Sequence, residues 1–171
     1  MQTTLHLLMG LPGAGKSTFA RTLHRLTGAE ILSSDEARLK LFTQPTFSQD
    51  EHDKLYEILD HNLKHLLEKG YSAIYDANLN RRCHREEKYS LASEFDTKVV
   101  LWWLQVPSDL ARSRRVNEQN HDLLPAGETP EKMFDRIAQI LEAPKDDEPY
   151  IVVDGTRISE DYVKELLELY S

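Results

Sequence analysis

Residues 10–17 read Gly10-Leu11-Pro12-Gly13-Ala14-Gly15-Lys16-Ser17, and this stretch predicts the fold of the whole chain. It matches G-x-x-x-x-G-K-[ST], a glycine-rich loop that turns its backbone N–H groups inward around phosphates. Glycine tolerates the backbone angles and the close approach that such a loop needs. The pattern places Lys16 at the β- and γ-phosphates and the Ser17 hydroxyl at a magnesium ion. The expected nucleotide contacts are Gly10, Leu11, Pro12, Gly13, Ala14, Gly15, Lys16, Ser17 and Thr18.

The residues on either side of this loop decide whether the match is meaningful. Residues 4–9 form a short apolar run that is typical of a buried strand. After the loop, apolar residues recur at helical spacing. A strand, a glycine loop and a helix whose positive end faces the phosphates are the setting that nucleotide binding requires. The helical stripe consists of Phe19, Ala20, Leu23 and Leu26.

Composition limits the class of protein. A length of 171 residues indicates one domain, residues 1–171, with a sizeable core. The net charge of −8 argues against a broad nucleic-acid-binding surface, although it leaves room for a local basic groove. The longest apolar run, residues 99–104, is too short to cross a bilayer, and no signal peptide is expected before the first strand. Because Cys83 is the single cysteine, a reducing cytoplasm is the expected location.

The remaining apolar runs predict four more strands, at residues 30–32, 72–75, 99–104 and 150–153. Helical patterns alternate with them, including a long helix over residues 49–69. Gly28 is expected to end the first helix, Ser33 or Ser34 to cap the second, and Asn80 to cap the helix that follows the third strand. Alternation of this kind predicts an α/β P-loop NTPase fold: a five-stranded parallel sheet with helices on both faces. Ligands of such sheets lie at the carboxyl ends of the strands.

Asp35 and Arg38 follow the second predicted strand. A kinase needs a carboxylate there to orient an acceptor hydroxyl and take its proton. Arg38 lies three residues further, on the same face of a helix, where it could hold an acceptor phosphate or stabilise the group being transferred. The alternative is that Asp35 only complements the helix dipole and Arg38 is solvated.

Asp76 and Asn78 follow the third predicted strand. A carboxylate at this point can hold magnesium through water or order the acceptor side of the site. Asn78 could bind substrate or simply support the turn.

Three arginines, Arg112, Arg114 and Arg115, lie on one short predicted helix, ahead of an apolar-poor stretch. This pattern indicates an arginine-bearing lid at about residues 110–128 that closes over ATP and supplies cations to its phosphates. The alternative is a solvated basic helix face. The pattern leaves open which arginine contacts the phosphates.

Together these motifs resemble a known family. The order P-loop, Ser34-Asp35-x-x-Arg38, Asp76-Ala77-Asn78-Leu79-Asn80-x-Arg82 and an arginine lid is similar to the polynucleotide 5′-kinase branch of P-loop kinases, which includes AAA-type predicted kinases. Zeta toxins and chloramphenicol phosphotransferases are more distantly similar. The resemblance covers nearly the whole chain.

The resemblance implies ATP and Mg²⁺ as ligands and assigns roles to individual residues. Lys16 and Ser17 would bind the phosphates and the metal, and Asp35 would be the general base. Arg38 would be its companion, Asp76 and Asn78 would form the acceptor side, and Arg114 would be the first lid arginine. Glu118 stands where the family usually carries a second lid arginine, so Arg115 or Arg112 is the candidate replacement.

The predicted function is transfer of the γ-phosphoryl group of ATP to a hydroxyl. The acceptor is either the 5′-hydroxyl of a polynucleotide or a small molecule such as a nucleoside, sugar or antibiotic. A nucleotide-hydrolysing switch or motor is the rival interpretation, but the sequence has no Asn-Lys-x-Asp guanine motif and its third strand ends in Asp76-Ala77 rather than Asp-Glu. The sequence predicts no oligomeric state, and the preference for ATP over GTP follows from the resemblance alone.

Overall fold

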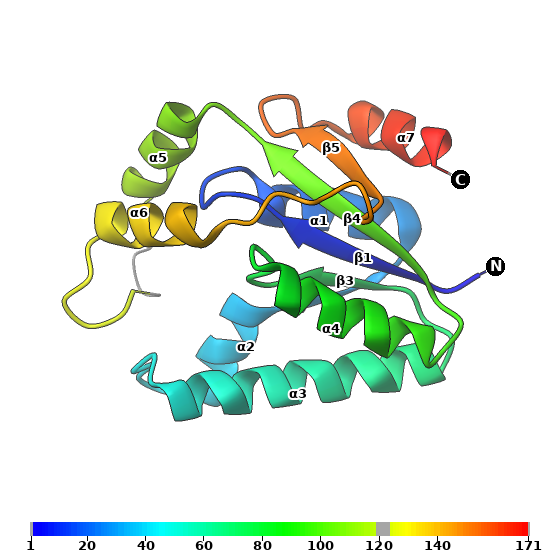
Figure 1. Cartoon of the computed structure of the whole chain (residues 1–171), viewed down its shortest axis with the longest axis horizontal. Coiled ribbons are helices and arrows are strands. Elements are labelled where there is room, and N and C mark those ends of the chain that lie inside the picture. Colours follow the sequence, from blue (N-terminus) through cyan, green and yellow to red (C-terminus); the bar gives the residue numbers. More distant parts are fainter. Residues whose placement is uncertain (1, 119–123, 171) are drawn as a thin grey trace.

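The computed structural model describes residues 2–118 and 124–170 (Figure 1). Five strands form one parallel sheet in the order β2-β3-β1-β4-β5, which confirms the predicted sheet. The first strand in sequence therefore lies at the centre, and the P-loop emerges from the middle of the sheet. The strands are β1 (Thr4–Met9), β2 (Glu30–Ser33), β3 (Ala73–Asp76), β4 (Lys98–Gln105) and β5 (Tyr150–Asp154).

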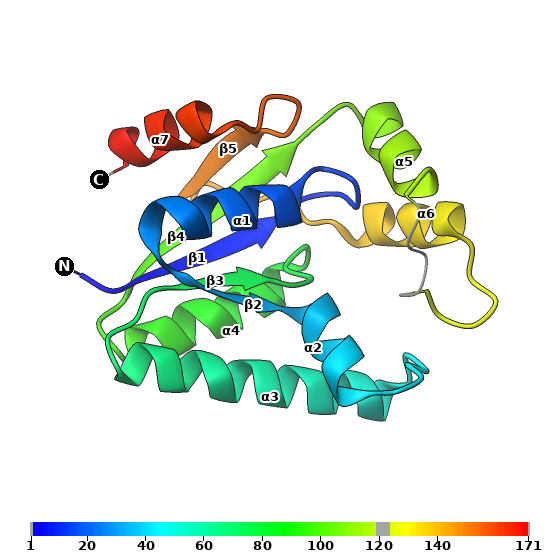
Figure 2. The ribbon, with the colours of Figure 1, turned by 180° about the vertical axis from the view of Figure 1, so that it is seen from behind.

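Seven helices lie within the described residues and cover both faces of the sheet, as predicted (Figures 1 and 2). Two helices, α1 and α7, pack on one face, and α3 and α4 pack on the other. The remaining three, α2, α5 and α6, stand beyond the carboxyl ends of the strands. The helices are α1 (Lys16–Thr27), α2 (Ser34–Leu41), α3 (Gln49–Glu68), α4 (Arg82–Ser93), α5 (Ser108–Val116), α6 (Pro130–Ile140) and α7 (Glu160–Leu169).

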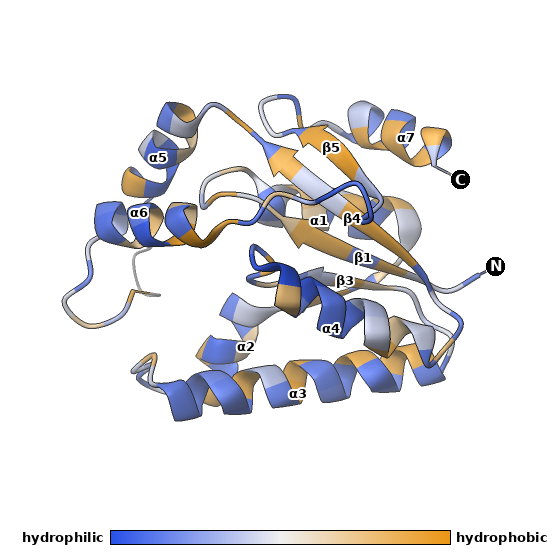
Figure 3. Cartoon of the chain, viewed as in Figure 1, coloured by the Kyte–Doolittle hydropathy of each residue, from blue (hydrophilic) through white to orange (hydrophobic). Residues whose placement is uncertain are grey.

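The core consists of two apolar layers separated by the sheet. Along β1, Leu7 and Met9 point to the α3–α4 side, whereas Leu8 points to the α1–α7 side. A central parallel strand must be apolar on both faces because helices cover both, and this explains the continuous hydrophobic run of β1. The hydrophobic colouring is correspondingly concentrated on the strands, while the helices show hydrophilic outer faces (Figure 3).

Two of the three predicted helix-end residues act as expected. Ser33 caps α2 by accepting a hydrogen bond from the Glu36 N–H, and Gly28 ends α1 in the left-handed conformation. The prediction for Asn80 is wrong, because α4 is preceded by Arg81 and has no side-chain cap. The Asn80 side chain instead contacts the P-loop.

The range predicted for the lid, about residues 110–128, covers most of α5 and ends before α6. Arg112 on α5 forms an ion pair with Asp135 on α6, 3.3 Å between Nη2 and Oδ2, which joins the two helices. Residues 119–123, in the middle of the predicted lid, lie outside the described residues. Among residues 2–118 and 124–170, no helix combines the length and the hydrophobicity needed to cross a membrane.

A histidine buried in the sheet predicts a pH-dependent stability. Burial, and to a lesser degree Lys98, lower the pKa of His6 from 6.5 to about 4, and the Trp102 Nε1–H donates to His6 Nδ1 at 3.1 Å. The unfolded chain takes up a proton as the pH falls through about 6.5, whereas the folded protein resists until about pH 4. The free energy of unfolding is therefore expected to fall by up to about 3 kcal/mol between these pH values.

His6→Gln is the matched control, because a glutamine oxygen can accept the Trp102 hydrogen bond without titrating. Urea unfolding of both proteins at a series of pH values measures the effect. The wild type should lose more stability than His6→Gln on acidification. Equal losses in the two proteins would contradict the assignment.

Candidate active site

A cavity of about 750 Å³ opens at the carboxyl ends of the strands, where ligands of open α/β sheets bind. The P-loop forms its floor, and α5 and α6 lie on one side. The start of α2, the turn after β3 and the loop after β5 complete its lining. The fold therefore brings segments that are far apart in the sequence into one site.

The P-loop has the geometry that its glycines predict. Gly13 has φ 82°, and a Cβ atom at this position would lie 2.2 Å from the Ala111 carbonyl oxygen. Only glycine fits both conditions. The loop ends at Gly15, and α1 begins at Lys16, so the positive end of α1 faces the cavity.

Lys16 lies across the mouth of the P-loop. Its Nζ donates to the carbonyl oxygens of Gly10 and Leu11, at 2.9 Å each. Burial lowers the pKa of Lys16, while the nearby carboxylates of Asp76 and Asp35 oppose that shift. The ammonium group is thus held against the backbone of the P-loop, inside the cavity.

Ser17 and Asp76 lie side by side, and the Ser17 hydroxyl donates to Asp76 Oδ2 at 3.1 Å. Burial raises the pKa of Asp76, against the opposing effects of Lys16 and Ser17. A hydroxyl and a carboxylate are suitable Mg²⁺ ligands, and Mg²⁺ usually completes its shell with water and phosphate oxygens. No group of three or more His, Cys, Asp or Glu side chains that could hold a metal ion occurs in the described part of the chain. The two oxygen donors of Ser17 and Asp76 fit an Mg²⁺ ion that is shared with phosphates.

The predicted acceptor-side residues also line the cavity. Asp35 lies in the first turn of α2, close enough to Lys16 to influence its pKa, and Asn78 lies in the turn after β3. Asn78 is fixed by its neighbours, since its N–H donates to the Tyr56 hydroxyl at 3.3 Å and its Oδ1 accepts from the Asn80 N–H at 3.3 Å. A hydroxyl entering between Asp35 and the P-loop would meet the carboxylate on one side and the phosphates on the other.

Arg38 does not enter this cavity. It is buried and pairs with Glu51 at the start of α3, and its guanidinium carbon lies 4.5 Å from the centre of the Phe47 ring. Glu51 is itself held by the Thr46 N–H and hydroxyl. Arg38 lines a second cavity of about 530 Å³, together with Phe47, His52, Lys132, Arg136 and residues 125–128.

The three arginines of α5 have three different environments. Arg114 Nη1 donates to the Gly155 carbonyl at 3.1 Å, on the wall of the main cavity. Arg115 also lines this cavity, where it pairs with Glu118. Arg112 is exposed and pairs with Asp135 outside the cavity lining.

Arg115 has an unusual feature. Its Nε is buried and, within the described residues, is the one buried side-chain nitrogen or oxygen with no hydrogen-bond partner. A partly buried cation with one buried, unmet donor, close enough to Lys16 to influence its pKa, suits a phosphate group in this cavity.

Sequence reasoning did not single out several residues that line the cavity. Two of these positions had a signal in the sequence that could have predicted them. The loop after β5 lies at the carboxyl end of a strand, where ligands bind, and Arg21 lies one helical turn after Ser17. The other positions have no local signal because tertiary packing brings them to the site. The lining residues that were not singled out are Arg21, Met133, Ile137 and Ile158. The lining also includes residues to which the sequence patterns assigned no ligand contact, and these are Ser34, Ala77, Asn80, Glu118, Gly155 and Thr156.

Gly155→Ala is expected to impair nucleotide binding. A Cβ atom at this position would lie 2.2 Å from the Ala14 carbonyl oxygen and 2.6 Å from Val106 Cγ1. The P-loop and the loop after β5 must therefore separate, which typically costs about 1–3 kcal/mol of stability. The measurements are thermal unfolding and the Kd for an ATP analogue, and we expect both to worsen.

Gly28→Ala is the control, because Gly28 has φ 72° but nothing lies within 4 Å of its added Cβ. It should lose about 1–2 kcal/mol through backbone strain while keeping its nucleotide affinity. Unchanged affinity in Gly155→Ala would show that the contact between Gly155 and Ala14 does not shape the site.

Comparison with known proteins adds independent information. One protein family, described as AAA domain, matches residues 5–144. NEDD4-binding protein 2 from Homo sapiens is 31% identical over 114 residues, which cover 63% of this chain. The match spans only 6% of the length of that protein.

Several solved structures share the fold. A putative kinase from Chloroflexus aurantiacus J-10-fl has a TM-score of 0.78 at 15% identity, with 100% of both chains covered. A sugar kinase from Janibacter sp. HTCC2649 has a TM-score of 0.70 at 19% identity, covering 98% of this chain and 94% of that one. A chain of the Pnkp1/Rnl/Hen1 RNA repair complex has a TM-score of 0.68 at 20% identity, covering 81% of this chain and 44% of that one.

Proposed function

Because this chain belongs to the AAA domain family, which matches residues 5–144, we propose that it is an ATP-dependent kinase that phosphorylates an acceptor hydroxyl. The observation that carries this proposal is the placement of Asp35 opposite Lys16 in one cavity. A site for hydrolysis alone has no need of a second binding region for an acceptor. Here α2 carries Asp35 into the main cavity and Arg38 into the second one.

Each residue of the main cavity has a separate role in the proposed reaction. The P-loop N–H groups and Lys16 bind the phosphates, and Ser17 and Asp76 hold Mg²⁺. When bound, Mg²⁺ neutralises charge on the β- and γ-phosphate oxygens. The Asp35 carboxylate orients the acceptor hydroxyl and accepts its proton.

The transfer step is an in-line displacement. The acceptor oxygen bonds to the γ-phosphorus while the bond from that phosphorus to the β,γ-bridging oxygen breaks. ADP leaves with the electron pair of that bond, and the hydroxyl proton passes to Asp35. The guanidinium groups of Arg114 and Arg115 stabilise the charge on the phosphoryl oxygens from the α5 side.

The second cavity supports an acceptor that carries a phosphate near its hydroxyl. Lys132 and Arg136 on α6 face Arg38 and His52 across this cavity, and Phe47 supplies an aromatic surface. Cations beside an aromatic ring suit a nucleotide unit. The 5′-hydroxyl end of a polynucleotide has this chemistry, and the likeness to a chain of the RNA repair complex supports it.

A small hydroxyl compound is the second candidate acceptor. The likeness to the Janibacter sugar kinase and the net charge of −8 favour it. Such an acceptor would occupy the space beside Asp35 without needing the second cavity.

Transfer of label from γ-labelled ATP with Mg²⁺ tests both candidates. We expect label on a 5′-hydroxyl oligonucleotide and none on the same oligonucleotide with a 5′-phosphate. Lys132→Ala should raise the KM for the oligonucleotide several-fold, whereas Lys164→Ala, on α7, should leave it unchanged. Label on nucleosides or sugars instead would identify a small-molecule kinase, and release of phosphate alone would refute both.

A further inference from the structure

We infer that Asn80 is a positioning residue that fixes the first residue of the P-loop in the conformation that binds a triphosphate. The inference rests on the proposed binding of nucleotide but not on the nature of the acceptor. Asn80 is 3% exposed, and neither the P-loop pattern nor the metal and acceptor assignments include it.

The Asn80 side chain bonds to both polar backbone groups of Gly10. Its Oδ1 accepts from the Gly10 N–H at 3.1 Å, and its Nδ2 donates to the Gly10 carbonyl at 3.2 Å. β1 ends at Met9 and its neighbour β3 ends at Asp76. The pairing of β1 with β3 ends at Leu7 and Tyr75, so the Asn80 amide adds a separate contact between the turn after β3 and the residue that follows β1.

Gly10 needs such support because it has no side chain to hold it. Its φ of 149° lies in a region that favours glycine, and a Cβ atom would lie 2.6 Å from the Leu104 carbonyl oxygen. The Gly10 carbonyl also accepts from Lys16 Nζ at 2.9 Å. Asn80 thus fixes the atom against which the Lys16 ammonium group rests.

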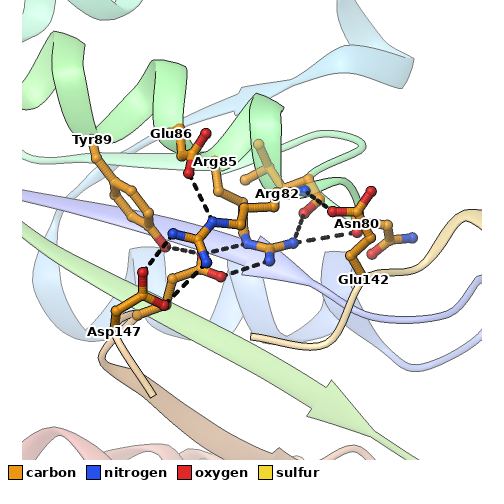
Figure 4. A network of polar contacts seen from close by, with 9 residues as sticks. Asn80, Arg82, Arg85, Glu86, Tyr89, Glu142 and Asp147 are labelled. Atoms are coloured by element: carbon orange, nitrogen blue, oxygen red, sulfur yellow. Dashed lines mark hydrogen bonds and ion pairs between the residues drawn. The ribbon is translucent and has the colours of Figure 1, made fainter. Parts of the chain in front are cut away.

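The backbone of Asn80 is itself anchored. Its carbonyl accepts from the Glu142 N–H at 2.8 Å and from Arg85 Nη1 at 3.3 Å. Arg85 is fully buried and binds Glu148 through two hydrogen bonds of 2.7 and 2.9 Å. Figure 4 shows Arg85 and Glu142 meeting the backbone next to Asn80. The segment between α6 and β5 therefore fixes the backbone of Asn80 through Glu142 and, through Glu148, by way of Arg85. The Asn80 side chain in turn fixes the first residue of the P-loop.

The hydrogen bonds require an amide at this position. Aspartate has the same shape, but an ionised aspartate has no donor and its second oxygen would face the Gly10 carbonyl. A protonated aspartate restores the pattern, because its O–H can donate to that carbonyl. Alanine removes both bonds and leaves the Gly10 groups to water from the cavity.

The test is the Kd for a non-hydrolysable ATP analogue, without acceptor, over about pH 5.5 to pH 8. We expect Asn80→Asp to bind at least about tenfold more weakly than wild type near pH 8, and to approach wild type as the pH falls. Asn80→Ala should bind about tenfold more weakly at every pH. Asn62→Asp, at an exposed position on α3, should match wild type throughout.

The ratio of each variant's Kd to the Kd of wild type, taken at the same pH, reports the effect of the substitution at residue 80. The other charged groups near the Gly10–Asn80 contact are present in every protein compared, and they are Lys16, Asp35, Asp76, Arg85, Glu142 and Glu148. Thermal unfolding establishes that the variants are folded. If Asn80→Asp does not fold, the Kd of Asn80→Ala tests the inference by itself.

A folded Asn80→Ala that binds the analogue as tightly as wild type would overturn the inference. So would an Asn80→Asp ratio that stays constant with pH. Because no acceptor is present, these outcomes are separate from the proposed transfer reaction, which could fail while the role of Asn80 stands.

Discussion

Lys16→Ala is expected to lower the rate of phosphoryl transfer by about two to three orders of magnitude, the usual effect of removing one donor that stabilises transition-state charge. Lys16 is the cation whose Nζ lies across the P-loop, on the carbonyl oxygens of Gly10 and Leu11. If a phosphate takes the place of these carbonyls, as proposed, the ammonium group gains a charged hydrogen-bond partner. The measurement is kcat with γ-labelled ATP and the Kd for ATP.

Lys164→Ala provides the control for loss of a positive charge. Lys164 lies on α7 and pairs with Glu160 at 2.9 Å on the surface. It should transfer phosphate at the wild-type rate. A Lys16→Ala enzyme with nearly normal kcat would mean that the cavity is not where the γ-phosphate reacts.

Asp35→Asn is expected to reduce transfer by about two to four orders of magnitude, the range for loss of a general base. The amide keeps the shape of the side chain but cannot take the proton of the acceptor hydroxyl. Within the described residues, Asp35 makes no hydrogen bond to the P-loop or to Lys16 and acts on Lys16 only through its charge, so the Kd for ATP should change less than about twofold. The variant should therefore bind nucleotide, fold normally and fail to transfer.

Glu36→Gln is the matched control on the same turn of α2. Glu36 is exposed, and its charge complements the same helix end as that of Asp35. If both variants lose activity equally, the effect comes from the helix dipole rather than from proton transfer. Loss confined to Asp35→Asn supports the general base.

Local sequence was sufficient to predict most of the fold. The P-loop, the apolar strands and the alternation with helices depend on short-range patterns, and all five strands lie where those patterns placed them. The position of Asp35 and Asp76 at the site also followed from topology, because Asp76 ends β3 and Asp35 lies in the first turn of the helix that follows β2.

Long-range contacts explain what the sequence could not predict. Helical spacing placed Arg38 beside Asp35, but it could not show that Glu51 arrives from the next helix to pair with Arg38. Asn80 has the residue type of a helix cap, and only the sheet order brings it to Gly10. The close approach of Gly155 to Ala14 depends in the same way on how the loop after β5 packs.

The most direct measurement follows the γ-phosphoryl group itself. Wild type and Asp35→Asn are incubated with γ-labelled ATP, Mg²⁺ and a mixture of a 5′-hydroxyl oligonucleotide, nucleosides and sugars, and the label is located on acceptor or in free phosphate. The account predicts label on an acceptor hydroxyl with wild type and almost none with Asp35→Asn. Release of free phosphate at equal rates by both proteins, with no acceptor labelled, would contradict it.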